Sequence, residues 1–515
     1  MSLQSWLDDE NARRNIFVVA TVYNVIAATE QNILLSNCAY MTADALSIFL
    51  PIISGNFAIT ESLNISGGYS ISYGDIELFN TGEYDDWLDH TKYIWVNRPI
   101  QVYVGDSSWI ATDFNDLDNT FYLIFNGVIA DIDCKSLTSL SIKVRDRQQD
   151  INAPVTEELM DTDGTWNGQQ PNEDSVKPLV FGEVHNIEPI LIDPVTLKYR
   201  FSTGASEQVI EIRDNGVPIY TYPSLTTGAT VNLTASTFTL TYPPAGQITA
   251  SIQGRKRTID LSTGVLSDSY TDNAAKIIGV IVTEYGKVGV SNLSSTDLHL
   301  SSMSGMPTYP VGIYLGTQKQ NIIDVCKQLA SSVGAEVFFN RNGELQLLKI
   351  GTITGGTEVV TEDDIVRNTL SVSNRTIPEA AKKIAYCKNW TIQEGIVTGI
   401  PDAHKEMFAT EWYYYNVSNI TTQTDYKLHA EVDQLDTLLL TTTGASSLAS
   451  SLNSYYSEPR TVYRFTSKSR LLSIKVGQGI ELFHHRFGLS SGKTGQVISV
   501  SPNWVEGTNV IEVII

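Results

Sequence analysis

The sequence predicts a mainly β, multidomain protein with a minority of helix, and three observations carry this prediction. The chain has 515 residues, which at roughly 100–200 residues per domain allows several domains. Apolar residues make up 42% of the chain and charged residues only 18%, so ordinary cores can form while much of the polar surface is uncharged. Short alternations of apolar and polar residues, separated by Gly, Asn and Asp, recur along most of the chain and are typical of strands.

The first β-rich region is expected over residues 1–150. It opens with a short amphipathic helix over 4–14, after which the period of the apolar residues changes to two. The strands predicted in this region are 16–25, 55–65, 69–79, 100–105, 122–132 and 137–144. Short strands at this spacing favour a closed antiparallel barrel or a sandwich.

A linker is expected over 151–190 and an inserted β-rich domain over 191–310. Pro and Gly among polar residues interrupt the pattern over 150–178, which indicates a loop. The predicted strands that follow are 179–184, 197–201, 208–214, 217–220, 238–242 and 248–252. Asp214-Asn215-Gly216 predicts a tight hairpin, because its turn needs residues that tolerate positive φ.

An α+β domain is expected over 311–395. Helices are predicted over 273–284 and, more strongly, over 320–333, where apolar residues recur on one face. Thr317 and Gln320 could form a capping box, and Gly334 could end the helix in the left-handed conformation. Two apolar runs around Arg341-Asn342-Gly343 predict a hairpin.

The last region, 396–515, is expected to form a second β block. A helix is predicted over 442–456. The strands predicted after it are 461–465, 472–476, 479–483, 496–500 and 510–515. A β-rich block is therefore expected at each end of the chain.

The charge and the cysteines exclude several classes of protein. With 35 basic and 57 acidic residues the formal net charge is −22, which argues against a surface that binds duplex nucleic acid. The four cysteines are far apart in sequence, so neither a zinc cluster nor a disulfide framework is expected; they are Cys38, Cys134, Cys326 and Cys387. No apolar run approaches about 18 residues and no signal peptide is recognisable, so no membrane insertion is expected.

A search for catalytic motifs favours none. The segment 488–494 reads GLSSGKT and has only three residues between its glycines where a phosphate loop needs four. It also spells the G-x-S-x-G pattern around Ser490, but no histidine follows in the chain. We therefore interpret it as a polar hairpin loop.

Histidines, acids and aromatic residues leave weaker alternatives open. His484 and His485 are adjacent, and neighbours on a strand point to opposite faces, so they are not expected to share a metal. The acids over 83–86 and 362–364 could serve glycoside hydrolysis if they faced one cleft. Residues 412–415, Trp-Tyr-Tyr-Tyr, could stack on sugars, although one packed and one exposed face is the favoured interpretation. We expect no catalytic, cofactor-binding or metal-binding residues and no cofactor.

Several segments taken together resemble the hub proteins of bacteriophage tails, which carry two tail-tube-type β-barrels in tandem. The likeness lies in the order of the segments along most of the chain, and it is weakest over 190–310 and 396–440. The segments that carry it are 74–80, 86–88, 99–106, 125–129, 140–146, 177–184, 320–333, 338–343 with Leu345, 471–480, 492–498 and 503–515.

This resemblance implies a structural, non-enzymatic baseplate hub or tail-tip component of a virion, assembled in the cytoplasm of a bacterial host. Tube-like barrels would lie at 1–150 and 396–515, and a homotrimer would adapt the six-fold tail tube to a three-fold tip. The expected partners are the distal tail protein, the tape-measure protein and a tip or fibre protein. Genomic DNA would pass through an acidic channel without specific binding, since like charges repel. The alternatives are a receptor- or carbohydrate-binding virion protein and a polysaccharide-degrading enzyme.

Overall fold

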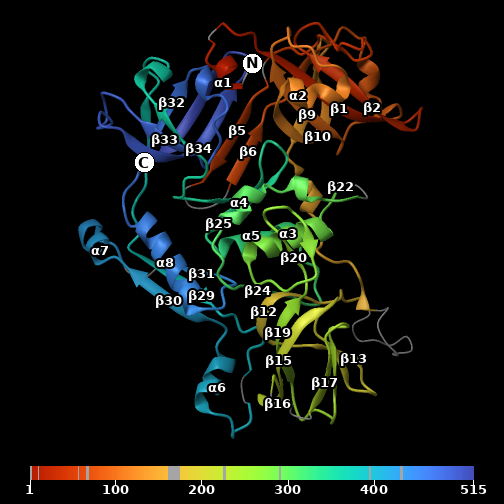
Figure 1. Cartoon of the computed structure of the whole chain (residues 1–515), viewed down its shortest axis with the longest axis vertical. Helices are drawn as coiled ribbons and strands as arrows, with labels where there is room; N and C mark the ends of the chain where they lie inside the picture. The colour runs from red at the N-terminus through yellow and green to blue at the C-terminus, as the bar shows by residue number, and fades with distance from the viewer. Residues whose placement is uncertain are drawn as a thin grey trace. The chain divides into compact units, whose positions relative to one another are not determined.

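A computed structural model describes most of the chain, and the mainly β, multidomain prediction is confirmed (Figure 1). The described residues are 3–9, 11–55, 57–64, 69–160, 174–223, 228–288, 291–393, 396–429 and 433–515. None of the helices in these ranges is long and apolar enough to cross a membrane.

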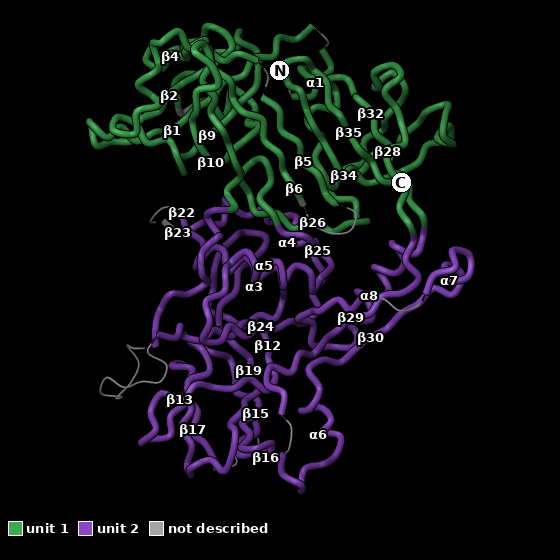
Figure 2. The backbone as a smooth tube through the Cα atoms, turned by 180° about the vertical axis from the view of Figure 1, so that it is seen from behind, with its two compact units in different colours: residues 1–148, 338–377, 459–515 green, residues 149–337, 378–458 purple. Residues whose placement is uncertain are grey.

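The chain forms two compact units, each assembled from separate stretches of sequence (Figure 2). Unit 1 comprises Met1–Gln148, Phe338–Ile377 and Pro459–Ile515, and unit 2 comprises Gln149–Val337 and Pro378–Glu458. The sequence-based domains were instead continuous segments. Residues 161–173 of the predicted linker lie outside the described residues.

The first sheet of unit 1 is built from the N-terminal region. In spatial order its strands are β2 (Thr29–Ser36), β1 (Asn15–Asn24), β9 (Pro99–Gly105), β10 (Tyr122–Ser136), β11 (Ser139–Arg145) and β7 (Ile76–Phe79), with β8 (Tyr93–Ile94) beside β1. Strand β1 is buried on both faces, because one face contributes to the core around Val18 and the other to an aromatic cluster around Phe17. The smaller elements beside this sheet are α1 (Leu3–Leu7), β3 (Tyr40–Met41), β4 (Ile48–Phe49) and α2 (Leu117–Thr120).

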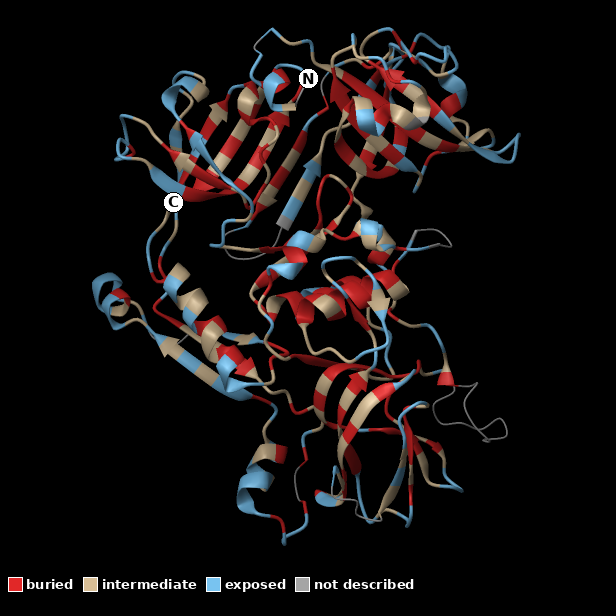
Figure 3. Cartoon of the chain, viewed as in Figure 1, coloured by how far each residue is buried: buried red, intermediate tan, exposed pale blue. Residues whose placement is uncertain are grey.

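The second sheet of unit 1 is built mainly from the C-terminal region. In spatial order its strands are β27 (Thr357–Val360), β33 (Gly479–Leu482), β34 (Lys493–Asn503), β35 (Thr508–Ile514), β32 (Thr461–Ser467) and β28 (Ser371–Arg375). A hairpin from the N-terminal region, β5 (Ile59–Leu63) with β6 (Tyr69–Tyr73), also joins this sheet. Along β35 and the second half of β34, buried positions alternate with intermediate ones, and the buried positions form the core face (Figure 3).

The two sheets share a four-strand pattern with the same register. We call β7, β9, β10 and β11 the first repeat, and β32, β33, β34 and β35 the second repeat. The central strand is β10 in one and β34 in the other, and the flanking strands follow in the same spatial order. Each central strand has a bulge that begins two residues after a glycine. In β10 the bulge lies between Ile129 and Asp131 and follows Gly127. In β34 it lies between Val497 and Ser499 and follows Gly495.

The equivalent glycines meet the same neighbour. A Cβ on Gly127 would lie 2.4 Å from the carbonyl oxygen of Arg145, and a Cβ on Gly495 would lie 2.4 Å from that of Ile514. Arg145 and Ile514 are the last residues of β11 and β35. At this distance any Cβ would clash with backbone, so both positions need glycine for the same steric reason.

Unit 2 has two sheets that enclose a core around Phe201, Phe238 and Ile252. The five-stranded sheet has the order β16 (Val217–Thr221), β15 (Ser206–Asp214), β19 (Ile248–Arg255), β12 (Leu179–Ile187) and β24 (Gly312–Leu315). The four-stranded sheet has the order β13 (Ile190–Asp193), β14 (Lys198–Arg200), β18 (Thr237–Leu240) and β17 (Ala229–Asn232).

The rest of unit 2 contains helices and short strands. A three-stranded sheet has the order β30 (Tyr413–Ser418), β29 (Ala381–Tyr386) and β31 (Gln434–Asp436). The helices are α3 (Ala274–Tyr285), α4 (Leu300–Ser304), α5 (Ile322–Ser331), α6 (Asp402–Ala409), α7 (Ile420–Tyr426) and α8 (Thr442–Tyr456). The short strands are β20 (Thr258–Ile259), β21 (Leu266–Ser267), β22 (Lys287–Val288) and β23 (Ser291–Asn292). The boundary between the units falls within β25 (Ala335–Phe339), which is followed by β26 (Leu345–Lys349).

Local signals predicted several elements well. Asn215 and Gly216 have positive φ and join β15 to β16, and Gly334 follows α5 with φ +71°. The capping box of Thr317 and Gln320 was wrong, because α5 begins after Asn321 and that residue makes no side-chain cap. The strand predicted over 472–476 was also wrong: these residues form turns between β32 and β33.

Candidate functional site

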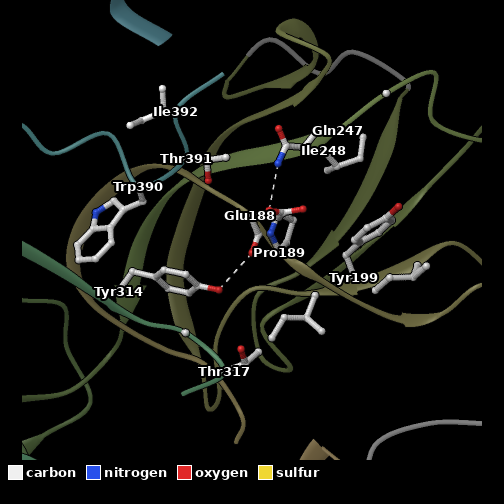
Figure 4. A pocket seen from close by; sticks show the side chains of 14 residues that line it. Glu188, Pro189, Tyr199, Gln247, Ile248, Tyr314, Thr317, Trp390, Thr391 and Ile392 are labelled. Carbon is white, nitrogen blue, oxygen red and sulfur yellow. Dashed lines mark hydrogen bonds between the residues drawn. The ribbon is translucent and has the colours of Figure 1, made fainter. Parts of the chain in front are cut away.

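A cavity of about 780 Å³ lies in unit 2 and is of a size that holds a small ligand (Figure 4). It is lined by residues from five places in the sequence, one of which is Tyr199 on β14. Glu188 follows β12, Gln247 precedes β19, Tyr314 lies on β24, and Trp390 follows β29.

Two buried asparagines hold the wall that carries Trp390. The Asn186 side chain donates to Asn389 Oδ1 at 2.8 Å and to the carbonyl of Thr391 at 2.6 Å. Asn389 in turn donates to the carbonyl of Phe408 at 2.9 Å. Asn186 has φ +57°, a conformation that asparagine tolerates better than most residues. Strand β12, which carries Asn186, and the segment 389–391 are therefore fixed relative to each other.

The polar groups of the cavity form a chain of hydrogen bonds. Gln247 Nε2 donates to the Glu188 carboxylate at 3.0 Å, and the Tyr314 hydroxyl donates to the carbonyl of Glu188 at 3.1 Å. Gln393 Nε2 donates to Gln247 Oε1 at 3.2 Å. Burial raises the pKa of Tyr314, so its hydroxyl remains a donor across the physiological range.

Aromatic rings form the apolar part of the wall. Trp390 and Tyr314 meet edge to face, with ring centroids 5.9 Å apart. The Lys388 ammonium lies 4.6 Å from the Trp390 ring centroid, a favourable cation–π contact. A half-exposed indole beside a carboxylate, an amide and hydroxyls suits a polyol or sugar ring, which offers both an apolar face and hydroxyls.

The cavity does not have the groups for glycoside hydrolysis. Glu188 is the single carboxylate among the fourteen lining residues, and that reaction ordinarily uses two. The arrangement fits binding rather than bond cleavage.

The acids singled out in the sequence have separate partners. Asp85 accepts a hydrogen bond from Asn80, and Asp86 pairs with Lys92 at 2.7 Å. Asp364 accepts from Arg470 Nε at 2.8 Å. Each of these carboxylates therefore has a local structural partner.

The aromatic run 412–415 does not alternate as predicted. Trp412 is buried, whereas the adjacent Tyr413 and Tyr414 are both exposed on β30. The Lys388 ammonium lies over the Trp412 ring, 5.1 Å from the ring centroid. Trp412 is not among the residues that line the cavity.

The two adjacent histidines do not point to opposite faces of a strand, as the sequence suggested. His484 and His485 lie after the end of β33, so strand alternation does not apply, and their rings stack with centroids 4.4 Å apart. Segment 488–494 does connect two antiparallel strands, β33 and β34, as the hairpin interpretation requires. Ser490 and both histidines line one hollow.

Sequence reasoning did not identify the cavity residues. Glu188, Tyr314 and Trp390 stand in unremarkable strand-like segments, and the cavity exists only because β12, β24 and the segment after β29 meet.

Comparisons with known proteins give distant likenesses only. No protein-family model matches the chain, and no curated protein matches it. Among solved structures, a 43 kDa tail protein of prophage MuSo2 from Shewanella oneidensis aligns over 97% of this chain and 98% of its own, with 9% identity and a TM-score of 0.38. A prophage tail protein from Listeria monocytogenes aligns over 97% and 94%, with 8% identity and a TM-score of 0.37. A chain of a gene transfer agent virion aligns over 67% and 85%, with 11% identity and a TM-score of 0.42. TM-scores below 0.5 do not establish a shared fold or function.

Proposed function

We propose that this protein is a structural, non-enzymatic component of a bacteriophage tail, located in the virion at the tail tip as its hub. The order of segments along the sequence suggests this role, and the two repeats of unit 1 support it. A chain that carries the same four-strand pattern twice can match a six-fold ring with three copies, since each copy supplies two equivalent positions.

One observation carries the ring proposal. In the second repeat, β5 pairs with β34 at Ser499 and Val500. The pairing of β33 with β34 reaches only as far as Gln496, opposite Gly479, the first residue of β33. The equivalent positions of β10 are Asp131 and Ile132. Among the described residues, no strand pairs with 131–136 on that side of β10. The edge of β10 at 131–136 is therefore unpaired in the part of the chain that the structure describes, whereas β5 pairs with the equivalent edge of β34. An unpaired strand edge of this kind is suited to receive a strand from another copy of the protein.

The remaining parts of the proposed role come from the resemblance to tail hub proteins. A homotrimeric ring would adapt a six-fold tube to a three-fold tip and contact the distal tail protein, the tape-measure protein and a tip or fibre protein. The net charge of −22 suits a channel wall that repels DNA phosphates, so that the genome passes without binding.

The test is the mass of the purified full chain by light scattering, combined with electron microscopy and hydrogen exchange. We expect a trimeric ring in which the amides of 131–136 exchange more slowly than in the monomer. The amides of Ser499 and Val500 serve as the internal control, because β5 covers them in both states. A ring in which 131–136 exchange as fast as in the monomer would show that another surface assembles it. A protein that stays monomeric in particles as well as in solution would contradict the hub role.

Carbohydrate or receptor binding is the second candidate function, and the cavity around Trp390 favours it. The test is binding of the full chain to a glycan array, followed by calorimetry with the best glycan. Trp390→Ala should abolish binding, whereas Tyr414→Ala, which removes an exposed aromatic ring outside the cavity, should not. Equal binding by wild type and Trp390→Ala would exclude this cavity as the site.

A further inference from the structure

Two parallel strand ends in unit 1 bring together residues that are far apart in sequence. β27 and β33 are parallel neighbours, with Val360 opposite Leu482. Parallel strands run in the same direction, so the residues that follow both strands emerge at the same edge of the sheet. Glu362 and His484 each stand two residues beyond this pair, and His485 follows.

The three side chains converge on one point. The potential ligand atoms of Glu362, His484 and His485 all lie within 4.8 Å of one another. The two imidazole rings stack with an interplanar angle of 24°. His485 Nδ1 lies 2.7 Å from Glu362 Oε1, and the His485 backbone N–H donates to the same oxygen at 2.7 Å.

The backbone around this cluster is held on both sides. The Phe483 amide donates to the carbonyl of Val360 at 2.8 Å, and the His484 amide donates to that of Leu489 at 3.2 Å. On the other segment, the Thr361 amide donates to the Asp364 carboxylate at 2.9 Å. The ligand positions are therefore fixed by the fold before any ion binds, which reduces the cost of ordering them.

We propose that Glu362, His484 and His485 bind a divalent transition-metal ion, with Zn²⁺ as the natural occupant. Two imidazoles and one carboxylate are a donor set that zinc accepts with tetrahedral geometry, leaving one position for water. The cluster opens into a hollow of about 390 Å³ that Ser490 also lines, which leaves room for that water. This site is independent of the proposed tail function and goes beyond it.

Binding requires the hydrogen bond at His484 Nδ1 to open. Its Nδ1 accepts a hydrogen bond from the Arg486 amide at 3.0 Å, so the neutral ring carries its proton on Nε2. The ion either replaces the Arg486 amide at Nδ1 or binds Nε2 after the proton has moved from Nε2 to Nδ1, and in both cases Nδ1 no longer accepts from Arg486. Both rings bind the ion in their neutral form, in which a nitrogen lone pair is available.

A bound ion would connect two segments of the second sheet. It would tie the turn after β27 to the loop between β33 and β34, and the ion would bind the folded state better than the unfolded chain. Binding should therefore raise the midpoint of thermal unfolding in proportion to the logarithm of the ion concentration.

The experiment is a titration of the full chain, free of any histidine tag, with ZnCl₂ and separately with CoCl₂. We expect one Zn²⁺ per chain by calorimetry, and visible absorption bands of tetrahedral Co²⁺ that Zn²⁺ displaces. The double variant His484→Ala with His485→Ala should lose both signals. Glu362→Gln should weaken binding by roughly 10–100-fold, whether the carboxylate binds the ion or only orients His485.

Two controls separate this site from other metal-binding groups on the chain. His90→Ala removes another exposed histidine, and Cys134→Ser removes the exposed thiol; both should bind as the wild type does. Circular dichroism and an unchanged unfolding midpoint without metal verify that the double variant is folded. Undiminished binding by the double variant, or no saturable binding by the wild type, would overturn the proposal.

Discussion

The two repeats of unit 1 are built alike but are bordered differently. Both have the same central bulge, the same glycine and the same order of four strands. Beyond β9 the first repeat continues with β1, which is antiparallel, whereas beyond β33 the second continues with β27, which is parallel. The shared pattern therefore determines the backbone of the repeat. The direction of the bordering strand determines which strand ends lie side by side at the edge of the sheet.

This difference explains where chemically useful residues gather. An antiparallel border places the end of one strand beside the beginning of the other, so the residues after β1 and after β9 leave at opposite edges. The parallel border brings the residues after β27 and β33 to one edge, where Glu362 lies beside His484 and His485. Duplication of a β pattern thus need not duplicate a site.

The largest expected effect comes from breaking the buried ion pair between β5, the strand that borders the second repeat, and Arg341. Glu61 of β5 and Arg341 are both buried, with a carboxylate–guanidinium distance of 3.7 Å, and Arg341 also donates to the carbonyl of Ser473. Arg341→Met removes the guanidinium charge beside the buried Glu61 carboxylate and should lower the free energy of unfolding by about 3–5 kcal/mol. Urea unfolding measures it.

The matched control for this prediction is the double variant Glu61→Gln with Arg341→Met. It should recover part of the lost stability, because the buried negative charge is removed together with the positive one. A double variant that is less stable than Arg341→Met alone would contradict this explanation.

The next effect tests the equivalence of the two repeats directly. Gly127→Ala and Gly495→Ala each place a Cβ 2.4 Å from a backbone oxygen, so each should destabilise the protein by about 1–3 kcal/mol or more. Gly356→Ala is the control, since a Cβ there has no neighbour within 4 Å. Thermal unfolding should show similar drops in the midpoint for Gly127→Ala and Gly495→Ala, and none for Gly356→Ala. An unchanged midpoint for Gly495→Ala would contradict the equivalence of the two glycines.

A pH experiment distinguishes the acids that flank the repeats. Burial would raise the pKa of Asp364, but hydrogen bonds from Arg470 and Thr361 hold it below the usual range. Such a carboxylate stabilises the fold above its unfolded pKa, near 3.9, and that stability is lost as the pH falls through the lower folded pKa. Asp364→Asn should cost about 1 kcal/mol at neutral pH and nothing once both states are protonated.

Asp146, which follows β11, should show the opposite sign. Burial raises its pKa, against the opposing effects of the Gln148 amide, Arg145 and Tyr73. A carboxyl with a raised folded pKa penalises the fold at neutral pH, and the penalty disappears as the pH falls below its unfolded pKa. Asp146→Asn should therefore leave the neutral-pH stability unchanged or increase it. Urea unfolding of both variants from pH 7 to pH 3 checks the two signs, and a parallel pH response would refute the contrast.

The smallest effect concerns equivalent positions of opposite charge. Lys143 on β11 pairs with Asp133 at 2.5 Å, whereas its counterpart in the second repeat, Glu512, lies 3.6 Å from Arg464. Both pairs are partly exposed, so Lys143→Ala and Glu512→Ala should each lower the free energy of unfolding only slightly, and less in high salt. Chemical unfolding in low and high salt measures this; a loss unaffected by salt would mean that packing, not charge, is responsible.

The sequence alone determined the features that depend on neighbouring residues. Period-two alternation predicted the β class, apolar spacing predicted α3, α5 and α8, and Asp214-Asn215-Gly216 predicted a hairpin, because turns and periodicity are local properties. The acidic balance was likewise readable without a fold.

The tertiary structure decided which distant strands became neighbours. Nothing local indicates that β27 lies parallel to β33, that β5 crosses to β34, or that Glu188, Tyr314 and Trp390 enclose one cavity. Every strand offers unpaired backbone groups along both edges, and the pairing is chosen by the burial of whole faces and the closure of long loops. For that reason the adjacent histidines, expected on opposite faces of a strand, lie stacked beside an acid more than a hundred residues away.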